Sequence, residues 1–150
     1  RHGKKEIMYE YSCKIQRIVD GDTCDCVLDL GFSVHHKCRV RLYGIDTPES
    51  RTRNRDEKAR GLLAKQFLKD SVKKKKIVLK TKLKDSKGKF GRILAEVWAD
   101  GINVNEDLVK NAHAVYYHGQ SKKDVEREHM ENRQLLIDKG IFDPSSVKEK

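Results

Sequence analysis

No apolar run in this sequence approaches the roughly 18 residues that mark a membrane-spanning helix. Residues 1–11 are polar and charged, and they lack the apolar core of a signal peptide. The chain begins with Arg1 rather than methionine, which leaves open whether a segment precedes it. We therefore expect no membrane partner, while the compartment stays undetermined.

The sequence also lacks the cysteine spacing of common zinc sites. Its 4 cysteines include Cys24 and Cys26, whose side chains would point to the same face of a strand. This pattern favours small core residues over a zinc site, and a disulfide stays open for an exported protein. With no internal repeat and no low-complexity linker, the 150 residues fit one domain with one hydrophobic core.

Charged residues, in contrast, are abundant. They make up 37% of the chain, and 33 Lys+Arg against 23 Asp+Glu give a net charge of +10. Residues 69–92 alone hold 11 basic and 2 acidic side chains. Such a run is either a solvated face or a surface that attracts a polyanion, of which nucleic acid is the commonest. Charge alone supports the two interpretations equally.

Short apolar segments separated by turn residues predict five strands. The first three cover residues 13–19, 23–30 and 32–45, with turns at Asp20-Gly21 and at Gly31. Two further strands are expected at residues 76–83 and 92–99. In the third strand, the side chains expected to point inward are Val34, Cys38, Val40 and Leu42.

Capping residues predict three helices. Asn54 and Asn103 each precede a glutamate by three positions, which is typical of a helix start. Ser121 caps a last helix, and Gly140 stands where a C-terminal glycine belongs. Five short strands with these helices predict an α+β fold, a five-stranded OB-fold β-barrel with three α-helices. We assign residues 12–143 to this domain, with an N-terminal extension (1–11) and a C-terminal tail (144–150).

Acidic and arginine side chains gather at the predicted strand ends. They are Asp20, Asp22, Arg41, Asp46, Glu49 and Arg92. Carboxylates brought together repel one another, and oxygen ligands without a partnered His or Cys favour Ca²⁺ or Mg²⁺ as the neutralising ion. Two arginines beside a metal indicate an anionic substrate, and a phosphodiester matches the guanidinium fork. Taken singly, each motif is an ordinary turn or a loop with a solvated arginine.

Four segments together resemble the staphylococcal nuclease-like, or thermonuclease, family. They are VDGDT (19–23), VRLYGIDTPE (40–49), GKFGRILAEVWADG (88–101) and VNEDLVKNAHA (104–114). The resemblance covers the chain from Cys13 to Asp143 and implies an OB-fold barrel with three helices. It also implies Ca²⁺-dependent cleavage of DNA and RNA that leaves 3′-phosphate ends.

The same resemblance implies a role for each matching residue. Asp22 and Asp46 would bind Ca²⁺ through their carboxylates, and Thr47 would bind it through its backbone carbonyl. The other residues would act on the substrate: Arg41 and Arg92 clamp the scissile phosphate, Glu49 positions or deprotonates the attacking water, Lys89 contacts a terminal phosphate, and Tyr116 and Tyr117 loosely match a tyrosine pair near the nucleotide.

The alternative function is a non-catalytic nucleic-acid-binding module on the same OB-fold. Modules of that kind lose acids or arginines, whereas the enzyme interpretation is favoured here by the presence of Asp22, Arg41, Asp46, Glu49 and Arg92. We expect a monomer that acts on DNA and RNA, and the preference between the two stays open. None of the 6 histidines is expected to be catalytic.

Overall fold

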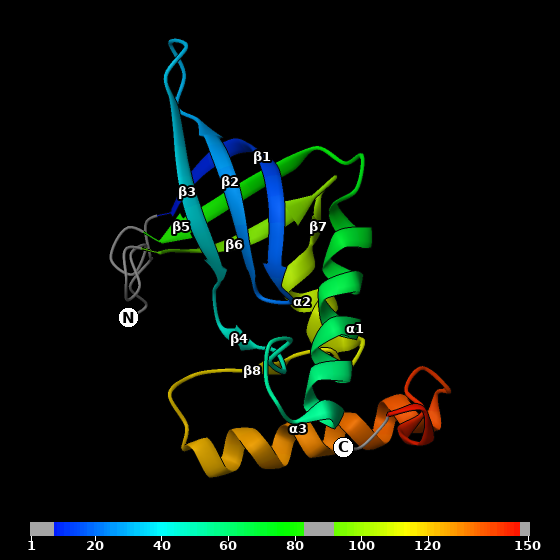
Figure 1. Cartoon of the computed structure of the whole chain (residues 1–150). Coiled ribbons are helices and arrows are strands. Elements are labelled where there is room, and N and C mark those ends of the chain that lie inside the picture. Colours follow the sequence, from blue (N-terminus) through cyan, green and yellow to red (C-terminus); the bar gives the residue numbers. More distant parts are fainter. Residues whose placement is uncertain (1–7, 83–91, 148–150) are drawn as a thin grey trace.

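The computed structural model describes residues 8–82 and 92–147 and has a closed barrel at its centre (Figure 1). One sheet has the order β3-β2-β1-β5-β6-β7, and a parallel pairing between β3 and β6 closes it. The strands are β1 (Met8–Asp20), β2 (Thr23–Asp29), β3 (His35–Leu42), β5 (Ile77–Lys82), β6 (Ile93–Ala99) and the two-residue β7 (Ile102–Asn103). The predicted α+β class and five-stranded barrel are confirmed.

Three helices pack outside this barrel: α1 (Arg55–Val72), α2 (Val104–Lys110) and α3 (Lys122–Asp138). α1 runs along one side of the barrel, and α3 crosses below it (Figure 1). A small sheet of β4 (Ile45–Asp46) and β8 (Val115–Tyr116) lies between the barrel and α3. Within the described ranges, no helix combines the length and apolar character that crossing a membrane requires.

Side-chain caps begin each helix at the predicted residue. The side-chain oxygens of Asn54, Asn103 and Ser121 accept hydrogen bonds from backbone N–H groups three residues later, at 3.0, 3.2 and 3.1 Å. After α3, Gly140 adopts a φ of 74°, the left-handed conformation that glycine tolerates best. The helix boundaries therefore follow from local sequence.

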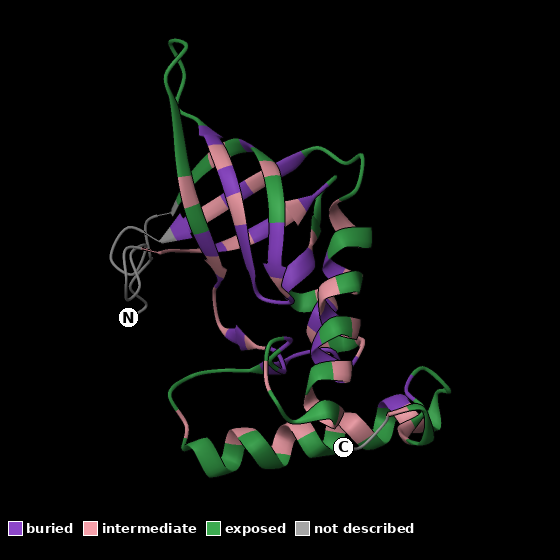
Figure 2. Ribbon diagram, in the orientation of Figure 1, coloured by how far each residue is buried: buried purple, intermediate pink, exposed green. Residues whose placement is uncertain are grey.

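The barrel core is made of alternate strand residues (Figure 2). Cys24 and Cys26 are 0% and 1% exposed and are free thiols, so their interpretation as core residues is confirmed. Val40 and Leu42 also point inward, whereas Val34 is 52% exposed and its predicted burial is wrong. Val34 closes the turn that joins β2 to β3, and this hairpin extends beyond the barrel (Figure 1).

The structure places ordered elements in both predicted terminal segments. β1 begins at Met8 and pairs with β5 as far as Cys13, where Glu10 lies opposite Lys80 and forms an ion pair with it at 3.9 Å. At the other end, Pro144–Ser146 forms a 3-10 helix, and Val147 packs against a small apolar cluster that contains Phe142. The ordered fold thus includes residues on both sides of the range 12–143.

Candidate active site

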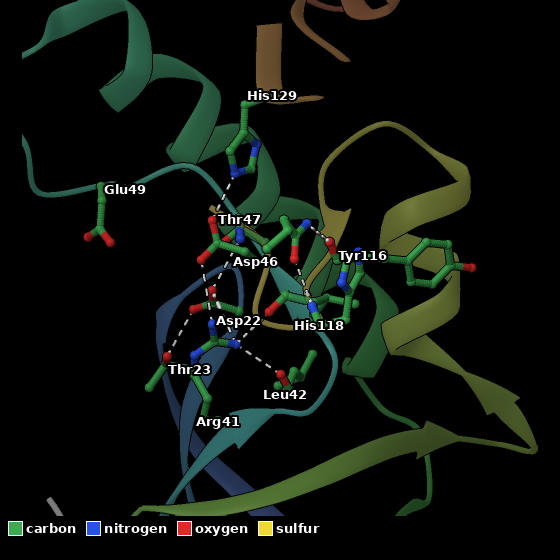
Figure 3. Close-up of polar contacts among 12 residues, drawn as sticks. Asp22, Thr23, Arg41, Leu42, Asp46, Thr47, Glu49, Tyr116, His118 and His129 are labelled. Carbon is green, nitrogen blue, oxygen red and sulfur yellow. Dashed lines mark hydrogen bonds and ion pairs between the residues drawn. The ribbon is translucent and has the colours of Figure 1, made fainter. Parts of the chain in front are cut away.

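The candidate site lies at one end of the barrel, where the turn after β1, the end of β3, and β4 meet (Figure 3). The backbone N–H of Leu42 donates to the carbonyl of Asp22 at 2.8 Å, which ties that turn to the end of β3. The register of β2 and β3 places Arg41 opposite Thr23, the residue after Asp22. Strand pairing therefore brings Arg41 and Asp22 together.

Arg41 lies between two carboxylates. Its Nη1 is 3.5 Å from Oδ2 of Asp22, and its Nη2 is 3.5 Å from Oδ1 of Asp46. Nη1 also donates to the carbonyls of Leu42 and Ile45, at 2.9 and 2.8 Å. The carbonyl contacts fix the guanidinium against the bend between β3 and β4, so its orientation is set before any substrate binds.

Asp22 is the most buried acid of the group. The residue is 8% exposed, and its carboxylate accepts hydrogen bonds from the N–H of Thr47 at 3.2 Å and from the hydroxyl of Thr23 at 3.0 Å. Burial raises the pKa of Asp22, and the charge of Asp46 raises it further, while Arg41 opposes the shift. Since burial dominates, the charged form of Asp22 would be stabilised by an additional cation.

Asp46 has a second partner that the sequence analysis did not identify. Nε2 of His129, on α3, lies 2.8 Å from Oδ2 of Asp46, and the His129 side chain is 13% exposed. The two oxygens of Asp46 therefore have different neighbours, Arg41 on one side and His129 on the other. The sequence carries no local signal for this contact, because it depends on how α3 docks below β4.

Glu49 lies to one side of this cluster (Figure 3). Glu49 is a mostly exposed residue, and its backbone N–H donates to Oε2 of Glu57 at 3.1 Å. Partial burial raises the pKa of Glu49, and the charges of Asp20, Asp22 and Asp46 raise it further. The carboxyl group thus binds a proton more readily than an ordinary surface glutamate, which suits a proton acceptor.

Two glycines allow α1 to pack closely against the acidic turns. A Cβ on Gly61 would lie 2.4 Å from the carbonyl oxygen of Glu49, and one on Gly21 would lie 2.7 Å from Cβ of Ala64. No side chain fits at those distances, so both contacts require glycine. Gly61 accordingly sets the position of the Glu49 backbone, a role that its place in a helix did not reveal.

Arg92 lies just before β6, beside the end of β3. It lines one pocket of about 1000 Å³ together with Arg41 and Asp46. The parallel pairing of Arg41 with Leu94 brings the two arginines to the same end of the barrel. The structure therefore brings Arg41 together with Asp22 and Asp46, and Arg92 lines the same pocket as Arg41 and Asp46.

Comparison with known proteins agrees with this arrangement. The family model described as "Staphylococcal nuclease homologue" matches residues 39–136, more than half of the chain. The chain belongs to this family. The matched range contains Arg41, Asp46, Glu49 and Arg92, while Asp22 lies before its first residue.

Individual relatives support the same family. An uncharacterised endonuclease of Haemophilus influenzae is 32% identical over 139 residues, covering 89% of this chain and 71% of that protein. The thermonuclease of Staphylococcus hyicus is 30% identical over 135 residues, covering 89% of this chain and 76% of that protein. Endonuclease YncB of Bacillus subtilis is 29% identical over 127 residues, but the match covers only 58% of its length.

The remaining predicted substrate contacts differ in their position. Tyr117 lines the pocket of Arg41 and Arg92, as does Lys122. Tyr116 is 51% exposed and donates its hydroxyl to Oε1 of Glu106 at 2.5 Å, toward α2. β8 ends at Tyr116, and the Tyr117 side chain that follows it has different surroundings from those of Tyr116. Lys89 lies outside the described residues.

The donor set suits a hard cation such as Ca²⁺. Asp22 and Asp46 supply carboxylate oxygens, and burial leaves the charge of Asp22 incompletely compensated. The buried Oγ1 of Thr47 has no hydrogen-bond partner among the residues that the structure describes. Among residues 8–82 and 92–147, no three His, Cys, Asp or Glu side chains converge on one point. Two carboxylates would thus need a backbone carbonyl and water to complete a shell of six to eight oxygens.

Proposed function

We propose that this chain is a Ca²⁺-dependent nuclease that hydrolyses phosphodiester bonds of DNA and RNA and leaves 3′-phosphate ends. The observation that carries the proposal is Arg41, held between Asp22 and Asp46 in the pocket that Arg92 also lines. Membership of the staphylococcal nuclease family, with relatives named endonuclease and thermonuclease, supports the nuclease activity.

The proposed metal ligands are Asp22, Asp46 and the backbone carbonyl of Thr47. Bound there, Ca²⁺ would supply positive charge beside the scissile phosphate. The N–H of Thr47 already donates to Asp22, which holds the backbone of Thr47 next to that carboxylate. His129 and Arg41 constrain the two oxygens of Asp46, so the acid is oriented from both sides.

The two arginines are proposed to bind the phosphate oxygens. A guanidinium presents two parallel N–H donors, which match two oxygens of one phosphate group. Negative charge on those oxygens grows as water adds to phosphorus, so contacts from Arg41 and Arg92 strengthen toward the transition state. Such contacts raise turnover more than they raise substrate affinity.

Glu49 is proposed to position or deprotonate the attacking water. The water oxygen forms a bond to phosphorus as its proton passes to Glu49 or to solvent, the bond from phosphorus to O5′ breaks, and the departing 5′ oxygen takes a proton from solvent water. This cleavage leaves the phosphate on the 3′ side. The raised pKa of Glu49 makes its carboxylate a better proton acceptor than a fully solvated one.

The alternative is a binding module that holds nucleic acid without cleaving it. A digest of defined DNA and RNA oligonucleotides separates the two functions. In Ca²⁺ we expect shorter products whose 3′ ends become extendable by polymerase only after phosphatase treatment, and in excess chelator we expect no products. Binding without cleavage in Ca²⁺ would support the module instead, and full activity in chelator would contradict the proposed metal.

A further inference from the structure

A second concave surface lies between β1 and the C-terminal half of α1, apart from the pocket that Arg41 and Arg92 line. We call it the basic groove; its volume is about 890 Å³, and it shares no lining residue with the pocket of Arg41 and Arg92. Its cationic lining residues come from two distant parts of the sequence: Lys14, Arg17, Lys65, Lys69 and the run Lys73, Lys74 and Lys75. Among the described residues that line it, the only acid is Asp70.

The lysines of the basic groove are not neutralised by neighbouring acids. Lys14, Lys69 and Lys75 are exposed, and across residues 8–82 and 92–147 no carboxylate forms an ion pair with them. The Asp70 carboxylate accepts a hydrogen bond from Gln66 at 2.9 Å rather than pairing with a lysine. A concave surface with this many uncompensated charges of one sign concentrates anions.

The backbone just after α1 has an uncommon conformation for a lysine. Lys74 follows the C-cap residue Lys73 and adopts a φ of 58°, the left-handed conformation in which helices usually carry glycine. Lysines near a helix C-terminus also interact favourably with the helix dipole, which accounts for Lys69 and Lys73. That effect does not account for Lys14 and Arg17, which lie on β1 and complete the other wall of the groove.

The basic groove begins next to the acidic turns of the site. Ala64 of α1 lies against Gly21, and the next residue, Lys65, already lines the groove. Gly61, at the backbone of Glu49, and Lys73, the residue after the end of α1, are twelve positions apart, about 18 Å along the helix axis. In one strand of B-form nucleic acid that distance spans about five phosphates.

We propose that the basic groove binds the phosphate backbone of a nucleic-acid strand at a distance from the phosphodiester that is cleaved. This inference rests on the proposed function for the identity of the polyanion. Because the far end of the groove, at Lys73, lies about 18 Å along α1 from Gly61, a substrate of a few nucleotides in the active site does not reach that end, whereas a longer strand does. Since lysine contacts to phosphate carry no base readout, binding in the groove is independent of sequence.

The test compares two triple variants of the full chain. Lys14, Lys69 and Lys75 are changed to Gln in the groove variant, and the exposed Lys37, Lys58 and Lys110 are changed to Gln in the control, so both lose the same charge. Affinity for a fluorescent oligo-dT of about 20 nucleotides, long enough to pass the groove, is measured in chelator over a range of salt. Because no cleavage is needed, the readout stays valid even if the chain is not a nuclease.

We expect the groove variant to bind the oligonucleotide about tenfold more weakly at low salt, with the slope of log affinity against log salt reduced by about 2. In the control variant, the affinity and the salt slope should both fall clearly less. In Ca²⁺, the groove variant should raise KM for the long oligonucleotide but leave kcat, and KM for a trinucleotide, unchanged. Equal losses in the two variants would overturn the groove as a site, and so would a groove variant that loses affinity for phosphatidylserine vesicles but keeps it for the oligonucleotide.

Discussion

Nε2 of His129 lies 2.8 Å from Oδ2 of Asp46, although the two residues are 83 positions apart in the sequence. The contact connects α3 to β4, and it orients the acid that also approaches Arg41 through its other oxygen. His129 does not face the scissile phosphate in the proposed mechanism. We therefore regard it as a positioning residue for Asp46, which leaves the prediction of no catalytic histidine untested.

Removal of this contact should weaken Ca²⁺ binding at the proposed site. In His129→Ala, Asp46 can rotate, and we expect Ca²⁺ affinity to fall roughly 10- to 100-fold, as is usual when a hydrogen-bond partner of a ligand is lost. Calorimetric titration with Ca²⁺ and Tb³⁺ luminescence measure the affinity without requiring turnover. His129→Gln, which keeps a side-chain donor, should recover part of it, and the exposed His36→Ala should match the parent. Unchanged affinity in His129→Ala would refute the positioning role.

Replacement of either proposed arginine clamp by lysine tests the transition-state role. Lysine keeps the charge of Arg41 or Arg92 but loses the planar fork, so we expect kcat to fall about 10²-fold or more for each variant. KM should change much less, because basic residues elsewhere still attract the substrate. Steady-state kinetics on one DNA substrate give both constants.

Arg39→Lys is the matched control for the arginine variants. Arg39 lies on the same strand but pairs with Asp25 at 2.8 Å outside the site, so its replacement should leave kcat unchanged. Thermal melts of Arg41→Lys guard against a folding defect, since Arg41 also contacts two carbonyls. If Arg92→Lys raised KM and left kcat untouched, Arg92 would be a ground-state binding residue and the proposed mechanism would be wrong.

Glu49→Gln should separate chemistry from metal binding. Gln keeps the shape of the side chain but accepts no proton, and we expect kcat to fall by about 10²-fold, the range attributed to a positioned acid or base. Calcium affinity should stay close to that of the parent, because Glu49 is not a proposed ligand. Glu126→Gln, an exposed change on α3, serves as the control. Turnover equal to that of the parent would exclude Glu49 as the base.

The sequence predicts those parts of the structure that depend on residues close together in the chain or on adjacent strands. Asn54, Asn103 and Ser121 cap helices through bonds that reach only three residues along the chain, so their sequence context suffices. The meeting of Arg41 with Asp22 follows from the antiparallel pairing of β2 with β3, which places Arg41 opposite Thr23, the residue after Asp22. Their proposed roles stay predictions even though their proximity is present.

The parts that the sequence does not predict depend on how helices dock. The contact of His129 with Asp46 requires α3 to lie below β4, and nothing within either segment specifies that position. The contact of Gly61 with Glu49 is similarly hidden, since a glycine inside a helix has no local signature of what packs against it. The predicted burial of Val34 is wrong for a different reason. Its apolar side chain suggests a core position, but Val34 lies in a hairpin that extends beyond the barrel.

The buried His113 should make folding stability depend on pH. Burial, assisted by the charge of Lys139, lowers the pKa of His113 from 6.5 to about 4. Between those values the unfolded chain binds a proton that the folded chain does not, so stability is complete above pH 6.5 and is lost as the pH falls toward 4. The shift corresponds to about 3 kcal/mol at most.

His113→Leu is the variant that isolates this effect. Within the described part of the chain, the buried Nδ1 of His113 has no hydrogen-bond partner, so its removal leaves no partner of Nδ1 unpaired. Denaturant unfolding at a series of pH values should show a smaller loss of stability in His113→Leu than in the parent over the acid range. His118→Leu, at an exposed position, should follow the parent curve. Parallel curves for all three proteins would show that His113 is not the titrating group.

Gly61→Ala tests whether the approach of α1 to Glu49 matters for both stability and activity. On propensity alone, alanine should stabilise a helix interior by up to about 1 kcal/mol relative to glycine. Here, however, the new Cβ would lie 2.4 Å from the carbonyl oxygen of Glu49 and 2.7 Å from the backbone nitrogen of Ser50, so backbone must move. We expect a net loss of about 1–3 kcal/mol, the usual cost of overpacking.

The displaced backbone should also lower turnover, because the segment that Gly61 contacts carries Glu49. The next residue, Ser50, donates a hydrogen bond to the carboxylate of Asp20, so the displacement would disturb that contact too. Turnover in Gly61→Ala should therefore fall at temperatures where the protein is still folded, while Ca²⁺ affinity falls less. Lys58→Ala, an exposed change on the same helix, gives the response to alanine without the steric conflict. The contradicting outcome is a Gly61→Ala protein that is as stable and as active as Lys58→Ala. In that case α1 and the Glu49 segment can move apart without effect, and their close approach has no role in holding the site.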